Sequence, residues 1–182
     1  MTFQRIADDT VQGSVAGLIA TVPMTLSMKI LHRLLPLHER HPLPPRWITM
    51  RALKMLGRSP PRVPFARKAL TLAAHFSYGA AAGVVYRYAN RRALHPGSGS
   101  GIAYGLAVWA GSYLGILPAI GLLAPPKRHS LRRNALMIAS HVVWGWALGE
   151  VTRRMEGLPR APRRIASWDG SRAPLPQSHG RP

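Results

Sequence analysis

Two histidines lie inside long uncharged stretches of the sequence, and they are the strongest candidates for a chemical role. His75 and His141 lie in the same local pattern, H-x-x-[YW]-G-x-x-x-G. Imidazole titrates near neutral pH, and its ring nitrogens bind protons or metal ions. Two such rings facing one another across a helix bundle could ligate a haem iron or another metal, or pass protons. In a purely structural alternative, each neutral ring hydrogen-bonds a neighbouring helix. The candidate partners are Tyr78, Tyr104, Tyr113 and a carbonyl freed by Pro118.

No enzyme motif accompanies these histidines. The six acidic residues lie outside or at the edges of the apolar stretches and form no motif, and we find no Ser–His–Asp set or phosphate loop. The lack of cysteine excludes disulfides, iron–sulfur clusters and cysteine-based zinc sites. His38 and His41 have ligand-like spacing but lack further ligands. We therefore predict a non-enzymatic protein with no metal site and no cofactor, haem held by His75 and His141 being the alternative.

Four apolar stretches must position the two histidines: residues 11–30, 69–86, 101–124 and 135–151. A helix needs roughly 20 apolar residues to cross the hydrocarbon core of a bilayer. Basic residues flank the stretches, and Lys29, at the end of the first, can snorkel to the headgroups. The second and third stretches lack the polar stripe of a buried helix in a soluble protein. The sequence therefore predicts an all-α membrane protein with four transmembrane helices.

The remaining segments are more polar. Residues 1–10 lack the features of a removable signal peptide, so we expect the first helix to be retained. In the basic connection 31–68, the segment RWITMRALKMLGR is either an irregular loop or a short helix in the headgroup plane. In such a helix, Arg51, Lys54 and Arg58 would share a face and contact lipid headgroups. The tail, residues 153–182, is rich in Pro, Arg, Ser and Gly and is predicted to be disordered.

The formal net charge of +19 would make nucleic acid the first partner to consider in a soluble protein. Here the basic residues adjoin apolar stretches, so we predict anionic lipid headgroups as the partner and no nucleic acid. With four crossings, one side of the membrane would carry 11 Lys and Arg residues and the other 13. The positive-inside rule therefore leaves the orientation open.

The apolar stretches also resemble one another. Stretches two and four share the histidine pattern at an offset of 66 residues, and stretches one and three share G-S-x-x-G at an offset of 98. We interpret this as a duplicated helix pair, with coincidence among glycine-rich helices as the alternative. Glycines four residues apart let helices approach closely, and so many of them also favour a homo-oligomer. The predicted helix-packing positions are Gly13, Gly17, Gly79, Gly83, Gly111, Gly115, Gly145 and Gly149, with a further pair at Gly101 and Gly105.

The segments GSVAGLIATVPMTLSMKI, AAHFSYGAAAGVVYR, WAGSYLGILPAIGLL and MIASHVVWGWALGEV resemble the YagU-type bacterial inner-membrane proteins, small multi-helix proteins without an assigned activity. The resemblance covers about residues 11–152 and implies a multi-pass protein of the bacterial inner membrane. It brings no site residues with it. Three functions follow as expectations: a structural or interaction protein first, then a small transporter or channel that uses the histidine pair, or a haem protein.

Overall fold

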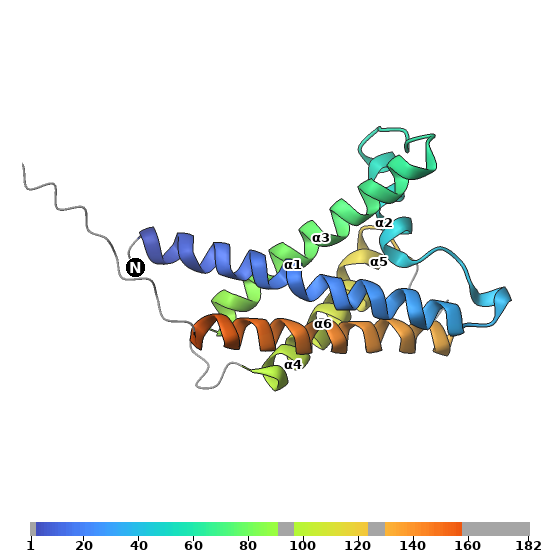
Figure 1. Cartoon of the computed structure of the whole chain (residues 1–182). Helices are drawn as coiled ribbons and strands as arrows, with labels where there is room; N and C mark the ends of the chain where they lie inside the picture. The colour runs from blue at the N-terminus through green and yellow to red at the C-terminus, as the bar shows by residue number, and fades with distance from the viewer. Residues whose placement is uncertain (1–2, 91–96, 124–129, 158–182) are drawn as a thin grey trace, which may run out of the picture.

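The computed structural model describes residues 3–90, 97–123 and 130–157, and its regular structure within these ranges is entirely helical (Figure 1). This confirms the all-α prediction. The predicted disordered tail lies outside the described residues from residue 158 onward. The helices are α1 (Phe3–Leu34), the 3-10 turn η1 (Leu37–Glu39), α2 (Pro44–Met55), α3 (Pro64–Ala89), α4 (Ser98–Ala110), the π-helical segment η3 (Gly111–Ile116), α5 (Leu117–Ala119) and α6 (Leu131–Gly157).

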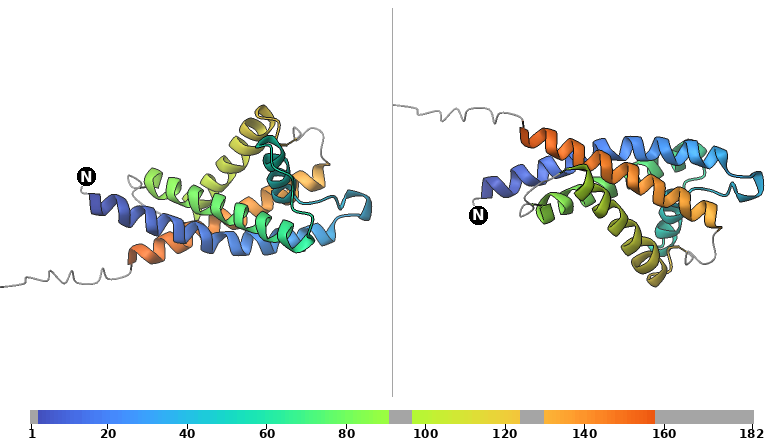
Figure 2. Two further views of the ribbon diagram at one scale, coloured as in Figure 1. Left: turned by 90° about the horizontal axis from the view of Figure 1, so that it is seen from above. Right: turned by 90° about the horizontal axis from the view of Figure 1, so that it is seen from below.

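The long helices alternate in direction. α1 and the continuous rod α4–η3–α5 run one way, while α3 and α6 run the other way (Figures 1 and 2). α1 packs along both α3 and α6, and α4 packs along α6. α3 and α4 touch little and diverge toward the end of the bundle where α2 lies against α3 (Figure 2). The bundle therefore widens at that end.

Glycines set the crossing of α1 and α3. A Cβ atom added to Gly13 would lie 2.7 Å from the Cα of Val84, and one added to Gly17 would collide with the carbonyl oxygen of Gly79. One added to Gly83 would collide with the carbonyl oxygen of Gly13. The two backbones are thus in direct contact, which only glycine permits.

A second crossing of the same kind joins α4 and α6. A Cβ atom added to Gly101 would lie 2.8 Å from the backbone nitrogen of Gly149, and one added to Gly105 would lie 2.5 Å from the carbonyl oxygen of His141. One added to Gly145 would collide with the carbonyl oxygen of Gly101. The crossing of α4 and α6 therefore resembles that of α1 and α3, because glycines bring the two backbones into contact in both.

Within the described residues, two helices and not four are long and apolar enough by composition to cross a membrane: α1, and the rod Ser98–Ala119. The expectation of four such helices is corrected in this respect. α3 carries Arg67, Lys68 and Arg87 near its ends, and α6 carries charged residues near both ends as well as Ser140 and His141, which are buried.

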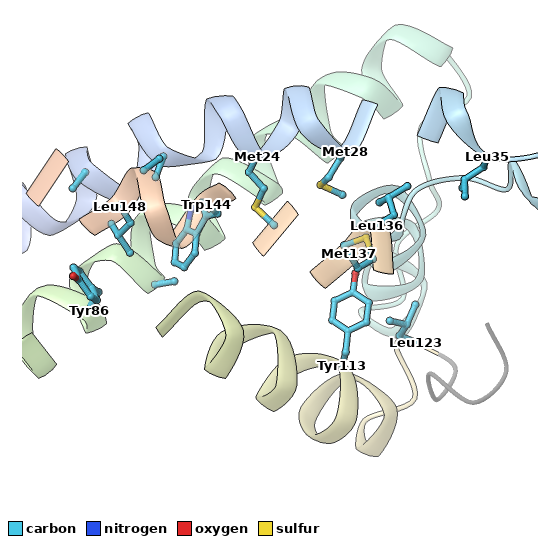
Figure 3. Packing of buried hydrophobic residues seen from close by; sticks show 14 residues of the cluster. Met24, Met28, Leu35, Tyr86, Tyr113, Leu123, Leu136, Met137, Trp144 and Leu148 are labelled. Atoms are coloured by element: carbon cyan, nitrogen blue, oxygen red, sulfur yellow. The ribbon is translucent and has the colours of Figure 1, made fainter. Parts of the chain in front are cut away.

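The core lies between α1, α6 and the rod, and Figure 3 shows its larger members. Met24 and Met28 of α1 face Met137 and Trp144 of α6, and Tyr113 points toward Met137 from η3 (Figure 3). Methionine is flexible enough to fill the irregular gaps that diverging helices leave.

Polar clusters join the helices at both ends. At the end where α1 begins, Arg87 of α3 donates to Asp9 of α1 at 3.0 Å and also pairs with Glu156 of α6. At the other end, the hydroxyl of Ser130 donates to Glu39 at 2.6 Å. Arg133 donates there to the backbone carbonyls of Glu39, His41 and Pro42. The connection that leads into α2 is thereby held against the start of α6.

Candidate functional site

A cavity of about 290 Å³ lies where the helices diverge, and both His75 and His141 line it. We call it the chamber. Its walls come from α1, α2, α3, the α4–η3–α5 rod and α6, and none of the described residues that line it has a charged side chain. Besides the two histidines, its polar lining residues are Thr21, Thr49, Tyr78, Ser112 and Tyr113. The structure thus brings the two predicted histidines to one site.

His141 is the more buried of the two, with 5% of its surface exposed. Its Nδ1 atom donates a hydrogen bond to the carbonyl oxygen of Met137 at 2.7 Å, within its own helix. In the neutral ring the Nε2 atom is then an acceptor. The ring meets Tyr113 edge to face at a centroid distance of 6.0 Å. His141 is therefore held in one orientation with one nitrogen left to bind a proton or a donor.

His75 is less constrained. Its Nε2 atom is buried and has no hydrogen-bond partner among the described residues. Two of the three tyrosines predicted as partners form other hydrogen bonds: Tyr78 bonds the hydroxyl of Ser112 at 2.9 Å, and Tyr104 donates to the carbonyl of Ala82 at 2.8 Å. An unpaired buried polar atom costs free energy, which a bound molecule with a matching group would recover.

The π-helical segment η3 shapes one wall. Pro118 has no N–H to continue the α-helical ladder, and the N–H of Leu117 reaches back five residues to the carbonyl of Ser112. The wider turn leaves both Ser112 and Tyr113 buried, and both line the chamber. The sequence signal for this feature was the proline that follows G-S-Y-L-G-I-L.

Hydrogen bonds close the seam between α3 and the rod, where the backbones make few contacts. Tyr78 bonds Ser112 beside the chamber, and Tyr86 bonds Ser100 at 2.9 Å nearer the other end. Side-chain bonds rather than packed backbone therefore separate the chamber from the surroundings of the bundle on this side.

The residues that could hold a cofactor are His75 and His141. Within residues 3–90, 97–123 and 130–157 there is no group of three or more His, Cys, Asp or Glu side chains that could hold a metal ion. If a haem were bound, His75 and His141 would be the residues to hold its iron, since His75 Nε2 is unpaired among the described residues and His141 Nε2 is not used in the bond to Met137.

The other predicted residues fall into three groups. Arg51, Lys54 and Arg58 are exposed on α2 and the turn that follows it. No atom lies within 4 Å of a Cβ placed on Gly111 or Gly115, so these two glycines face open space rather than another helix of the chain. The remaining six predicted glycines lie in the two crossings described above.

Glu150 accepts hydrogen bonds from Arg153 at 2.6 Å and Arg154 at 2.8 Å. The bond to Glu150 raises the pKa of the Arg153 guanidinium, so this group stays charged. Sequence reasoning did not identify Thr21, Thr49 or Ser112 as lining residues. Ser112 belongs to the G-S-x-x-G match, which indicated helix packing rather than a cavity, and no pattern marks Thr21 or Thr49.

A family model described as "Protein of unknown function (DUF1440)" matches residues 62–149 of the chain. The matched segment runs from just before α3 into α6 and contains both histidines of the chamber. No curated protein and no solved structure matches the chain. The chain is therefore similar, over this segment, to proteins whose function is not known.

Proposed function

We propose that this chain is a non-enzymatic, multi-pass membrane protein that binds a small, largely apolar molecule in the chamber. The observation that carries the proposal is the convergence of His75 and His141, from two separate helices, on a cavity without charged walls. Ligand sites are typically apolar cavities with a few placed polar groups. The chamber has this composition, and His75 Nε2 offers one polar group that lacks a partner.

The outer surface supports a membrane location. Along the outward face of α1, apolar side chains are exposed over the whole predicted span: Val11, Val15, Leu18, Ile19, Val22, Leu26 and Ile30. Such a surface suits lipid rather than water. α3 has 26 residues and α6 has 27, so each is about 40 Å long and exceeds the hydrocarbon core. Four crossings are part of the proposal.

The two matching glycine crossings support a duplicated helix pair, with α1 and α3 as one copy and α4 and α6 as the other. The proposal includes kinship with the YagU-type proteins and a place in the bacterial inner membrane. Its expected lipid contacts are the exposed Arg51, Lys54 and Arg58. Nucleic acid is not a partner in this account.

The chamber is tested with a neutral fluorophore whose emission rises in apolar surroundings, added to the full chain in detergent micelles or lipid nanodiscs. Val108 lines the chamber, so Val108→Trp should fill it and abolish saturable binding. Leu114→Trp is the matched control, because Leu114 lies on the same rod, is 60% exposed and does not line the chamber. Equal saturable binding by the unaltered chain and the Val108→Trp variant would refute a ligand chamber.

Passage of protons or a small solute is a second candidate, because both imidazoles open onto one cavity and neither needs the other as a hydrogen-bond partner. Flux through vesicles containing the protein would then change with pH and fail in the His75→Ala/His141→Ala variant. Haem as the ligand is decided by the visible absorption spectrum. A Soret band that this double variant loses would make the chamber a haem site, and a colourless protein from haem-replete cells would reject it.

A further inference from the structure

A second cavity, of about 430 Å³, adjoins the chamber at the end of the bundle where α1 ends and α3 begins. It lies between the last turns of α1, the start of α2 and the first turns of α3. Met28, Pro45 and His75 line both cavities. The two cavities are thus neighbours with a common wall at His75.

The charge of this cavity differs sharply from that of the chamber. Lys29, Arg46, Arg67 and Lys68 contribute four cationic side chains to its lining, which includes no carboxylate from the described part of the chain. We call it the basic vestibule. None of the four forms an ion pair with a carboxylate in the described part of the chain. The hydroxyls of Thr25 and Thr71 add hydrogen-bonding groups.

The backbone adds to this positive potential. α2 begins at Pro44 and α3 at Pro64, and both first turns lie at the vestibule without an acidic side chain. Helix N-termini carry a partial positive charge, which favours a nearby anion. Four cations from three helices and two helix N-termini therefore converge on one cavity.

In the proposed membrane, the vestibule lies closer to the surface than the chamber. Lys68 stands just before the apolar stretch of α3, and His75 lies seven residues further along, about 10 Å deeper in the proposed membrane. A molecule with an anionic group at headgroup level and an apolar body pointing inward matches this order of charged and uncharged walls.

We propose that the basic vestibule binds the phosphate group of an anionic lipid, whose apolar part extends past His75 into the chamber. This inference rests on the proposed function, since it names the class of molecule that the chamber receives. The residues that bind the phosphate group in this proposal are Lys29, Arg46, Arg67 and Lys68. They are distinct from Arg51, Lys54 and Arg58, the expected lipid contacts on α2 and the turn that follows it.

The test is native mass spectrometry of the full chain released from detergent and titrated with phosphatidylglycerol, with zwitterionic phosphatidylcholine or with inorganic phosphate. The vestibule variant is Lys29→Gln/Arg46→Gln/Lys68→Gln, and the matched control is Arg51→Gln/Lys54→Gln/Arg58→Gln. All six residues are exposed, and each variant removes three charges. Circular dichroism checks that both variants keep their helices.

We expect the vestibule variant to bind phosphatidylglycerol about ten-fold or more weakly and the control variant to bind it as the unaltered chain does. Equal weakening in both variants would mean general surface attraction and overturn the proposal. So would equal binding of phosphatidylcholine. Full displacement of phosphatidylglycerol by inorganic phosphate at the same concentration would overturn the lipid as the source of the phosphate.

The fluorophore assay on the same preparations separates the two proposals. Loss of phosphatidylglycerol selectivity with retained fluorophore binding would reject the vestibule alone. Absence of saturable fluorophore binding in the unaltered chain would reject the chamber, and with it the lipid that is proposed to enter it.

Discussion

At the scale of single residues, the glycines and the histidines of this chain have different roles. The glycines at the two crossings allow backbones to touch, so their effect is on stability. The histidines line a cavity, and the unpaired Nε2 of His75 has no structural bond to lose. Substitutions at the two kinds of position should therefore be separable by experiment.

Gly145→Ala should destabilise the bundle. Its Cβ would collide with the carbonyl oxygen of Gly101 and lie 2.9 Å from the carbonyl carbon, so α4 and α6 would have to move apart. Overpacking of this kind costs about 1–3 kcal/mol, more than the better helix propensity of alanine returns. Thermal unfolding in detergent, followed by circular dichroism, measures the loss.

Gly111→Ala is the control for this experiment. Gly111 has helical torsion angles and open space around its Cβ position, so the melting temperature should stay the same or rise slightly. Equal losses for Gly145→Ala and Gly111→Ala would show that the contact between α4 and α6 is not what holds these helices.

Part of this residue-scale description could be predicted from the sequence. His75 and His141 are conspicuous because ionisable groups are rare in apolar stretches. The G-S-x-x-G match suggested that Gly111 and Gly115 correspond to Gly13 and Gly17, but in the crossings it is Gly101 and Gly105 that take the equivalent place. The sequence pattern alone cannot show which glycine pair packs against another helix, because the rotation of the helix about its axis determines which pair faces the neighbour.

At the scale of elements, hydropathy gave the positions of the four long helices but not their ends. α1 begins at Phe3 and α6 ends at Gly157, beyond the apolar stretches, because charged residues such as arginine form helices well but are not apolar. The connection contains a helix, α2, that starts at a proline pair, where proline suits the first turn. Gly57, with a φ angle of 71°, follows its end and suits the left-handed conformation found there.

The π-helical segment could not be predicted. Pro118 marks a break in the helical ladder, but whether a helix kinks, ends or widens there depends on tertiary packing. Ser112 and Tyr113 lie in this segment and line the chamber. The chamber as a cavity was likewise beyond sequence reasoning, since it arises from the divergence of α3 and the rod.

Arg87→Met tests the junction of three helices. The Arg87 side chain is 12% exposed and pairs with carboxylates from α1 and α6, so its loss leaves two partly buried anions without their shared cation. We expect a loss of about 1–3 kcal/mol, measured by thermal unfolding. Arg153→Met removes a pair that is 56% exposed on the arginine side and should change little.

Neutralising Glu156 in the Arg87→Met background, with Glu156→Gln, should restore part of the stability, because this carboxylate then no longer needs the cation that was removed. Arg87→Met and Arg153→Met variants with the same melting temperature would contradict a structural role for this junction.

At the scale of the whole molecule, the alternation of helix directions places the starts of α1 and α4 at one end with the ends of α3 and α6 (Figure 1). The chamber and the vestibule lie toward the opposite end, beside α2. If all four long helices cross the membrane, each end of the bundle faces one aqueous side. If only α1 and the rod cross, the start of α4 lies on the same aqueous side as the start of α3. The start of α6 then lies on the same side as the start of α1.

Four membrane crossings are tested most directly by finding from which side of the membrane single cysteines can be labelled. The cysteines are introduced into a chain that has none of its own. Asp8→Cys, Gly97→Cys, Arg58→Cys and Arg132→Cys are labelled with a membrane-impermeant maleimide in intact cells and in inverted vesicles. Four crossings predict that positions 8 and 97 are labelled from one side, and positions 58 and 132 from the other. Labelling of position 97 from the side of position 58, and of position 132 from the side of position 8, would mean that only two helices cross and would contradict the account.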